Sequence, residues 1–258
     1  KPRYGHGLPA HQRLLEIIDS QRETYQFWLG KINALAPQLQ AIKKLSEEKD
    51  SKQPGWNNDF LPGLDIIALY TIIAETKPRR YVEVGSGNST KVAFRAITDQ
   101  GLSTKITSID PYPRAEIDSL AHEIVRVPFE SVDTGWLAEL EAGDILFIDN
   151  SHRMLPNSDA TVFFLETLPS LRPGVIVHIH DIYLPYDYPQ FMCDRFYSEQ
   201  YGLAIALLAN PKRYQPIFPA YFISEDAALS GAIAGIWEHL NTQGVERHGG
   251  SFWLKIGA

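Results

Sequence analysis

The sequence predicts an α/β protein built on a doubly wound, mostly parallel sheet. After residue 55, short apolar runs of strand length alternate with segments of helical periodicity. Glycine and polar residues follow directly after several of these runs, which is where ligands lie in such sheets. The chain has 258 residues, of which 44% are hydrophobic, so it is long enough for one large α/β domain and is not a disordered chain.

The first 55 residues are predicted to form a helical extension. Between residues 11 and 35, Leu, Ile, Tyr and Trp side chains recur at spacings of three and four, which is typical of helices. Pro37 interrupts this pattern and is expected to start a second helix that runs through Leu45. The charged stretch that follows ends in Pro54 and Gly55, which we interpret as the boundary between units 1–55 and 56–258.

The second unit is expected to contain seven strands. They are predicted at 81–84, 105–109, 124–127, 144–148, 175–179, 214–218 and 251–256. Helices are predicted between them at 65–75, 89–99, 115–121, 132–140, 158–168, 190–209 and 227–240. The first five strands alternate with helices, which favours parallel pairing with right-handed crossovers and helices on both faces.

Composition excludes several classes of protein. There are 24 Lys and Arg against 31 Asp and Glu, a net charge of −7, which argues against a nucleic-acid partner. The only cysteine, Cys193, allows no intrachain disulfide and no Cys-rich zinc site. Apolar stretches such as 66–74 are too short to cross a membrane, and no secretory signal opens the chain at Lys1. A soluble cytoplasmic protein without a membrane partner is therefore expected.

A glycine turn follows the first predicted strand. Gly85 and Gly87 let the backbone turn tightly and let a ligand approach, and Ser89 or Thr90 is expected to cap the next helix. The dinucleotide fingerprint has a third glycine where Thr90 stands, and the Gly-Lys-Ser/Thr of a phosphate loop is absent. Because Glu83 precedes it, we interpret the turn as a ligand-binding turn and not only as a tight connection between a strand and a helix.

Asp110 ends the second predicted strand. Its carboxylate can accept hydrogen bonds from both hydroxyls of a ribose. The alternative is that it caps the turn before Pro111.

Two later strands end in acidic and imidazole side chains. Asp149 and His152 follow the strand at 144–148, and His180 and Asp181 follow the strand at 175–179. These four side chains are expected to meet at one rim of the sheet, where a His or Asp could remove a proton from an acceptor. A second interpretation is a divalent ion such as magnesium, held by Asp149, Asp181 and His180. A third interpretation is that Asp149 and Asp181 only cap turns. The neighbouring His178 is interpreted as a histidine of the core.

The turn Glu83-Val84-Gly85-Ser86-Gly87-Asn88-Ser89, with Asp110 after the second strand, resembles the Rossmann-like class I S-adenosylmethionine-dependent methyltransferases. The later run Phe-Ile-Asp-x-Ser-His, which ends at His152, is similar to a bacterial small-molecule branch of that class. The resemblance covers Phe60 to Ala258. Many members have a third glycine where Ser89 stands.

The resemblance implies a fold and a cofactor. The fold is a doubly wound, seven-stranded, mostly parallel sheet with an antiparallel last strand, plus the N-terminal helical extension. Residues 56–258 would form the S-adenosylmethionine-binding domain, with the loop 128–131 beside the adenine. The residues it implies for the cofactor are Glu83, Gly85, Ser86, Gly87, Ser89, Asp110, Ser131 and Asp149. Metal-dependent members carry a further Asp or Asn where Ile182 stands here.

The expected activity is methyl transfer to a small-molecule acceptor, at a hydroxyl oxygen, assisted by a His/Asp base or a divalent metal. Two alternatives are a metal-dependent hydroxylase or hydrolase that uses the same rim, and a non-catalytic nucleoside-binding interaction module. A nicotinamide oxidoreductase is disfavoured by Thr90. The N-terminal helices, with Leu14, Ile17, Ile18, Trp28 and Ile32, are candidates for a homodimer interface or for a cap over the acceptor.

Overall fold

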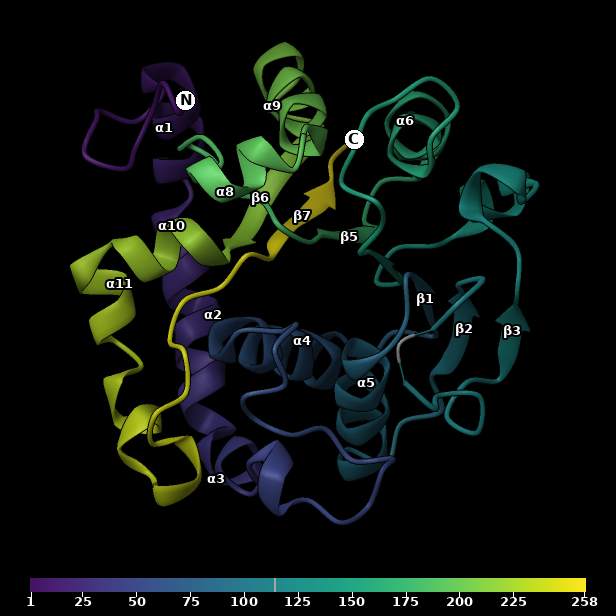
Figure 1. Cartoon of the computed structure of the whole chain (residues 1–258), viewed down its shortest axis with the longest axis vertical. Helices are drawn as coiled ribbons and strands as arrows, with labels where there is room; N and C mark the ends of the chain where they lie inside the picture. Colours follow the sequence, from purple (N-terminus) through teal and green to yellow (C-terminus); the bar gives the residue numbers. More distant parts are fainter. Residues whose placement is uncertain (114) are drawn as a thin grey trace.

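The computed structural model describes residues 1–113 and 115–258, and a seven-stranded sheet forms its centre (Figure 1). The strands lie in the order β3-β2-β1-β4-β5-β7-β6. They are β1 (Arg80–Val84), β2 (Lys105–Ile109), β3 (Glu123–Val125), β4 (Ile145–Ile148), β5 (Ile176–Ile179), β6 (Tyr214–Pro219) and β7 (Phe252–Ile256). Strands β1 to β5 pair in parallel, and β7 pairs antiparallel with both β5 and β6. The predicted fold class is thus confirmed, including the reversed last strand.

The two central strands β4 and β5 are covered on both faces. All four residues of β4 and all four of β5 are buried, and such continuous apolar runs are typical of parallel strands with both faces covered. The edge strand β3 has partly exposed residues and ends at Val125, two residues before the predicted end. Because β1 to β5 pair in parallel, their carboxyl ends lie at the same rim of the sheet.

The sheet order reverses between β1 and β4. From β1 the chain continues to β2 and β3 on one side, then returns to add β4 and β5 on the other. The crossovers leave the carboxyl ends of β1 and β4 without a covering connection, and ligands bind at such switch points in open α/β sheets. The glycine turn after β1 and Asp149 after β4 both lie at this position.

Helices of the N-terminal segment pack on the rest of the molecule. They are α1 (Gln12–Asp19), α2 (Arg22–Ala34) and α3 (Ala36–Gln40), and the first long helix after them is α4 (Gly63–Thr76). Helix α2 packs against α4 and β6. The five side chains considered for a dimer interface are buried within this chain, at 0–8% exposure: Leu14, Ile17, Ile18, Trp28 and Ile32.

The predicted helix from Pro37 through Leu45 is wrong beyond residue 40. Helix α3 ends at Gln40, and Leu45–Glu47 forms one 3-10 turn, η1. The reason is a backbone pairing, in which the Leu45 N–H donates to the Trp56 carbonyl and the Trp56 N–H donates to the Lys43 carbonyl, both at 2.9 Å. This pairing requires extended backbone at Lys44, which a helix would not allow.

Two predicted short helices differ as well. Residues 115–121 form bends and turns, because a helix of that length is marginal without tertiary support. Residues 132–140 contain a 3-10 helix, η3 (Thr134–Glu139), which Asp133 caps by accepting from the Gly135 N–H. The predicted helix at 158–168 is a continuous run of α6 (Asp159–Val162), the π-helix η4 (Phe163–Thr167) and α7 (Leu168–Ser170).

The long helix predicted at 190–209 is divided in two. Its parts are α8 (Gln190–Asp194) and α9 (Glu199–Ala209). Phe196, between them, has φ of +62°, which ends a helix. The helix predicted at 227–240 is likewise divided, into α11 (Ala227–Gly231) and the 3-10 turns η5 (Ala234–Glu238) and η6 (Leu240–Thr242). Before it lies a short helix that was not predicted, α10 (Ala220–Glu225). The predicted helix at 89–99 is α5 (Asn88–Asp99).

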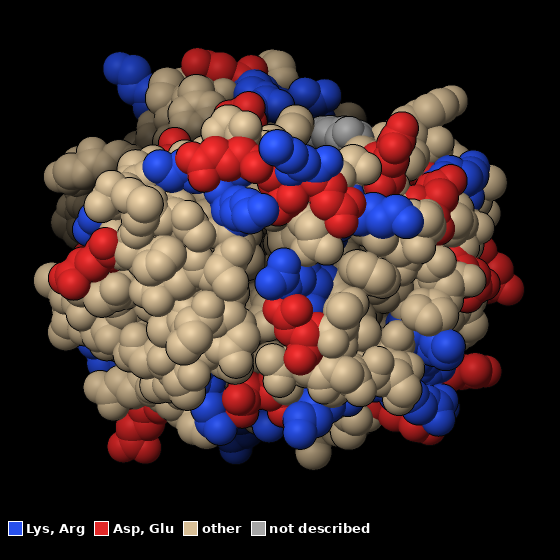
Figure 2. Space-filling view, turned by 90° about the horizontal axis from the view of Figure 1, so that it is seen from below, with Lys and Arg blue, Asp and Glu red and all other residues tan. Residues whose placement is uncertain are grey.

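The surface carries charges of both signs. On the face shown in Figure 2, acidic and basic side chains lie next to one another, so that this face has no patch of one sign alone. Among the residues that the structure describes, no helix combines the length and the apolar character needed to span a membrane.

Candidate active site

Gly85 sits where β1 meets both of its neighbours. Its φ is +79°, and a Cβ built on it would lie 1.8 Å from the carbonyl oxygen of Asp149. The Gly85 N–H donates to the carbonyl of Ile109 at 3.0 Å, and the Asp149 N–H donates to that of Val84 at 2.8 Å. Only glycine satisfies both the left-handed backbone and the close approach. The turn therefore lies flat against the ends of β2 and β4.

Glu83 supports this turn from inside the sheet. Its side chain is fully buried and accepts from the Tyr81 hydroxyl at 3.1 Å and from the Thr90 hydroxyl. Thr90 in turn accepts from the Gly87 N–H at 3.1 Å, so Gly87 rather than Ser89 or Thr90 caps α5. Burial raises the pKa of Glu83 to about 7, although hydrogen bonds from Ser89, Thr90 and Tyr81 oppose the shift. Glu83 does not line the cavities described below.

Asp110 faces the same turn. One of its carboxylate oxygens accepts from the Ser86 N–H at 2.8 Å, and the other accepts from the Tyr112 N–H at 2.8 Å. The Ser86 hydroxyl bonds to that of Ser108 at 2.8 Å. Asp110 therefore holds the turn in place, and its carboxylate retains lone pairs for a ligand.

Two adjoining cavities flank the turn. The first, of about 320 Å³, is lined by residues that include Gly85, Asp110, Phe129, Glu130 and Asn150. The second, of about 390 Å³, is lined by residues that include Gly87, Ser89 and Lys91. Ser86 and Asp149 line both. Ser131, predicted to contact the cofactor, is exposed and outside both linings, whereas its neighbours 128–130 line the first.

These cavities fit a nucleoside-bearing cofactor. Their volumes lie at the lower end of the usual range for small-molecule sites, and they meet at the switch point. The amide nitrogen of Asn150 is buried and has no hydrogen-bond partner, although Asn150 lines the first cavity. A donor of this kind is costly unless a ligand satisfies it.

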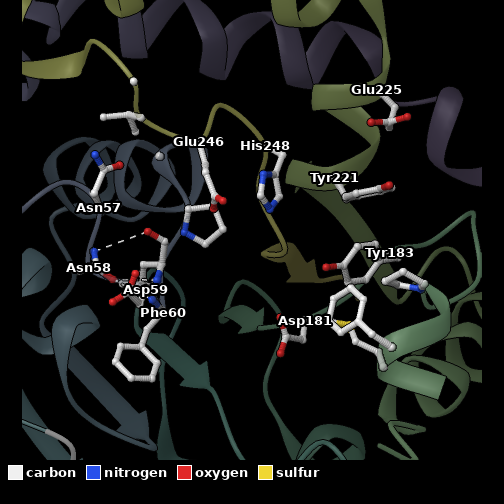
Figure 3. A pocket seen from close by; sticks show the side chains of 18 of the residues that line it. Asn57, Asn58, Asp59, Phe60, Asp181, Tyr183, Tyr221, Glu225, Glu246 and His248 are labelled. Carbon is white, nitrogen blue, oxygen red and sulfur yellow. Dashed lines mark hydrogen bonds between the residues drawn. The ribbon is translucent and has the colours of Figure 1, made fainter. Parts of the chain in front are cut away.

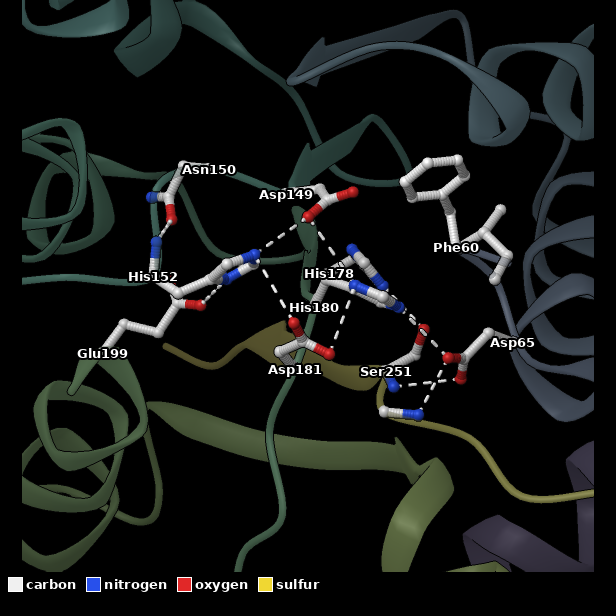
Figure 4. A network of polar contacts seen from close by, with 12 residues as sticks. Phe60, Asp65, Asp149, Asn150, His152, His178, His180, Asp181, Glu199 and Ser251 are labelled. Atoms are coloured by element: carbon white, nitrogen blue, oxygen red, sulfur yellow. Dashed lines mark hydrogen bonds and ion pairs between the residues drawn. The ribbon is translucent and has the colours of Figure 1, made fainter. Parts of the chain in front are cut away.

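His152 lies between two carboxylates (Figure 4). Its Nε2 is 3.4 Å from Oδ1 of Asp149 and 3.5 Å from Oδ2 of Asp181. His180 faces the same pair through Nδ1, at 3.6 Å from Asp149 and 3.7 Å from Asp181. The structure thus brings together all four residues that the sequence predicted at this rim.

Two further carboxylates complete this cluster, and sequence reasoning missed both. Glu199, at the start of α9, bonds to Nδ1 of His152, and Asp65, in the first turn of α4, lies 3.2 Å from Nε2 of His180. Asp65 also accepts from the Gly250 and Ser251 N–H groups, at 2.8 and 2.9 Å. An acid inside the apolar run 61–74 was a signal for Asp65, but no spacing connects Glu199 with His152.

The local backbone presents these side chains. His152 has φ of +61° and Asp181 has φ of +54°, conformations that cost energy in residues other than glycine. His152 is held by its N–H, which donates to the Asn150 side chain, and by its carbonyl, which accepts from the Ser198 N–H at 2.8 Å. The break between α8 and α9 is what places Ser198 there.

Charge pairing sets the protonation of the cluster. Burial lowers the pKa of His152, but Glu199, Asp181 and Asp149 outweigh burial and raise this pKa to about 9. Burial likewise opposes the shift at His180, whose pKa the carboxylates raise well above its ordinary value. For Asp149, burial raises the pKa, but the imidazoles of His180 and His152 lower it by more, so the net effect is a lowered pKa. At neutral pH both imidazoles are therefore cationic and offset part of the negative charge of the four carboxylates around them.

The structure does not support the predicted magnesium ion. Within 1–113 and 115–258, no group of three or more His, Cys, Asp or Glu side chains has an arrangement that could hold a metal. Asp149, Asp181 and His180, the predicted ligands, are engaged with one another and with His152. His178 is fully buried, stacks on Phe147 and bonds to Ser251 at 2.8 Å.

A third cavity, of about 920 Å³, opens beside Asp181 (Figure 3). Its lining includes the segment 57–63 and the aromatic side chains of Tyr183, Tyr221 and Phe191. Residues 58–61 also line the second cavity. The large cavity and the pair at the glycine turn are therefore adjacent, with the His–carboxylate cluster between them.

Comparison with known proteins agrees with this geometry. Residues 82–182 match the family model of a methyltransferase domain. No curated protein matches the chain.

Two solved structures resemble the chain at low identity. The methyltransferase of Podospora anserina bound to SAH has a TM-score of 0.45 at 13% identity, and covers 99% of this chain and 100% of its own. Human N-acetylserotonin methyltransferase in complex with SAM has a TM-score of 0.39 at 12% identity, and covers 98% of this chain and 61% of its own.

The strand order, the glycine turn at the switch point and the matched domain define the class of protein. The chain is an enzyme that contains a methyltransferase domain, matched over residues 82–182, within a Rossmann-like α/β sheet. The domain match spans the turn after β1, Asp110, the cluster residues Asp149 and His152, and the end of β5.

Proposed function

We propose that this enzyme methylates a hydroxyl group of a small molecule, with His152 as the proton acceptor. The observation that carries the proposal is the position of the His152 Nε2 between Asp149, at the cavities beside the glycine turn, and Asp181, at the large cavity. The first pair of cavities would hold S-adenosylmethionine and the large one the acceptor.

The residues of the two smaller cavities suit the parts of the cofactor. Asp110 would accept from the ribose hydroxyls, Phe129 would pack against the adenine, and Asn150 would donate through its unpartnered amide. The free N–H groups at the start of α5, with Ser89, would face the methionine carboxylate. Asp149 lies where a positive charge on the cofactor would be attracted.

When bound, S-adenosylmethionine supplies a methyl carbon that the acceptor oxygen attacks as the carbon–sulfur bond breaks, the sulfur keeping the electron pair. The chain has to align the two groups and to take the hydroxyl proton. Neutral His152 can accept this proton on Nε2, and Glu199 fixes the imidazole through Nδ1. A cation beside Asp149 would lower the pKa of His152 from about 9, which favours the neutral form.

Calorimetry tests the cofactor site directly. Titration of the chelator-treated enzyme with S-adenosylhomocysteine should give saturable binding, and Asp110→Ala should weaken it at least about tenfold by removing both the ribose acceptor and the support of the turn. Asp133→Ala, on the exposed surface outside the cavities, is the matched control. Equal binding by the wild type and by Asp110→Ala would contradict this assignment.

A further inference from the structure

The large cavity is acidic throughout. Four carboxylates line it, and no Lys or Arg is among its described lining residues. The carboxylates belong to Asp59, Asp181, Glu225 and Glu246. Its other ionisable side chains besides tyrosine are His6 and His248, so that even with both imidazoles protonated the lining would keep a net negative charge.

Three of these carboxylates form no ion pair with a cationic side chain in the described part of the protein. In the described part of the chain, the side chains of Asp59, Glu225 and Glu246 make no ion pair, whereas Asp181 faces His152 and His180. All three are exposed at the rim. Like charges that line one concavity reinforce each other's field and raise the local concentration of cations.

The hydroxyl of a largely buried tyrosine points into the same space. Tyr183 is only 8% exposed; its backbone N–H donates to Gln200, and its hydroxyl makes no hydrogen bond with the described residues. In Figure 3 this hydroxyl is directed toward the open centre of the cavity. Burial, together with the neighbouring Asp181 and Tyr221, raises the pKa of Tyr183, so the group stays a neutral donor and acceptor. Because the rest of this side chain is buried and the hydroxyl faces the cavity, the hydroxyl is available to a ligand there.

The tyrosine pair supplies a surface that suits a cation. The ring of Tyr221 lies 4.4 Å from that of Tyr183, centroid to centroid. Tyr221 and Glu225 are four residues apart on α10, and so on one face of that helix. Aromatic faces attract ammonium groups, and a carboxylate beside them completes such a site.

We propose that the acceptor carries a protonated amine, held by Glu225 and the Tyr183–Tyr221 pair, while its hydroxyl reaches the cluster at Asp181 and His152. This inference rests on the proposed function, because it assumes that the large cavity is the acceptor site. The inference adds that the acceptor is positively charged, a property that methyl transfer itself does not require. Asp59, in the segment 57–63, and Glu246 would strengthen the attraction for a cation at the opening of the cavity.

The test uses two series of related compounds that differ mainly in charge. The enzyme is first saturated with S-adenosylhomocysteine, and then titrated with 4-hydroxybenzylamine, 4-hydroxybenzyl alcohol and 4-hydroxybenzoate, and separately with glucosamine, glucose and glucuronate. We expect the amine to bind most tightly in at least one series, and the carboxylate to bind most weakly there. Glu225→Gln should weaken amine binding roughly three- to tenfold and leave the neutral compound unaffected.

The controls separate two kinds of failure. Glu238→Gln removes an exposed carboxylate outside the cavity and should change nothing. If the neutral or anionic compound binds as tightly as the amine in both series, or if no compound binds, the inference is wrong while S-adenosylhomocysteine binding stands. Failure of S-adenosylhomocysteine to bind would contradict the proposed function instead.

Discussion

The imidazole of His152 is bonded through Nδ1 to the carboxylate of Glu199, a residue 47 positions later in the chain. Glu199 is 1% exposed, and its second carboxylate oxygen is buried without a partner. The N–H groups at the start of α9 also face the His152 carbonyl. Side chain and backbone contacts together fix both the direction of the ring and its charge, so the two roles of Glu199 can be separated by mutation.

Glu199→Gln should shift the pH dependence of methyl transfer. The amide can keep a hydrogen bond to Nδ1 but carries no charge, so the pKa of His152 should fall by about one unit or more. The measurement is the rate against pH for wild type and variant, with Glu238→Gln as control. A lower rate with an unmoved profile would show that Glu199 acts only through packing.

The wild-type enzyme should become faster as the pH rises toward 9. Only neutral His152 accepts a proton, and below its pKa of about 9 the neutral fraction falls tenfold per pH unit. The expected result is a slope near one in log kcat/KM for S-adenosylmethionine, which reports the free enzyme. His152→Ala should lower kcat by roughly 10²–10⁴ and abolish this slope. A flat wild-type profile from pH 6 to 9 would exclude His152 as the base.

Gly85→Ala should destabilise the protein and prevent cofactor binding. The new Cβ would lie 1.8 Å from the Asp149 carbonyl oxygen, in addition to the strain of a positive φ. Gly101→Ala is the matched control, since its φ is +61° and nothing lies within 4 Å of its Cβ position. Urea unfolding should show a loss of about 1 kcal/mol for Gly101→Ala and a clearly larger one for Gly85→Ala. Equal losses would mean that the turn can move away from β4.

Glu83 should make the protein less stable as the pH rises from 5 to 8. Its folded pKa of about 7 lies above its ordinary value of 4.5, so the folded state binds the extra proton in between. The stabilisation is full below pH 4.5 and is lost as the pH passes 7, a change of about 3 kcal/mol. Glu83→Gln cannot titrate there. Its stability relative to wild type should therefore improve by about 2–3 kcal/mol between pH 5 and 8 in urea unfolding. A constant difference would argue against a neutral Glu83.

Much of the fold followed from local pattern. Apolar runs bounded by glycine, proline and polar residues located all seven strands. Of the residues just after them, Gly85, Asp110 and Asp149 gather at the switch point, and His180 lies 3.6 Å from Asp149. Parallel strands place their carboxyl ends at one rim, so order along the chain is enough to bring such residues together.

The misassigned helices show where local pattern stops. Residues 41–45 have helical spacing but pair with Trp56, and the predicted helix 190–209 breaks where its backbone turns toward His152. In each case a contact with a distant segment outweighs a local preference of a few tenths of a kcal/mol per residue.

The sequence by itself determined the class of fold, the glycine turn and the four-residue rim, because each depends on local features of the chain: the periodicity of apolar residues, the position of glycines, and the residues that directly follow a strand. Only the tertiary structure decided that Asp65 and Glu199 complete the cluster, and that Asp59, Glu225 and Glu246 line one cavity. These residues come from segments far apart in the chain. Periodicity reports which face of a segment is buried, but the partner across that face is chosen by packing of the whole molecule.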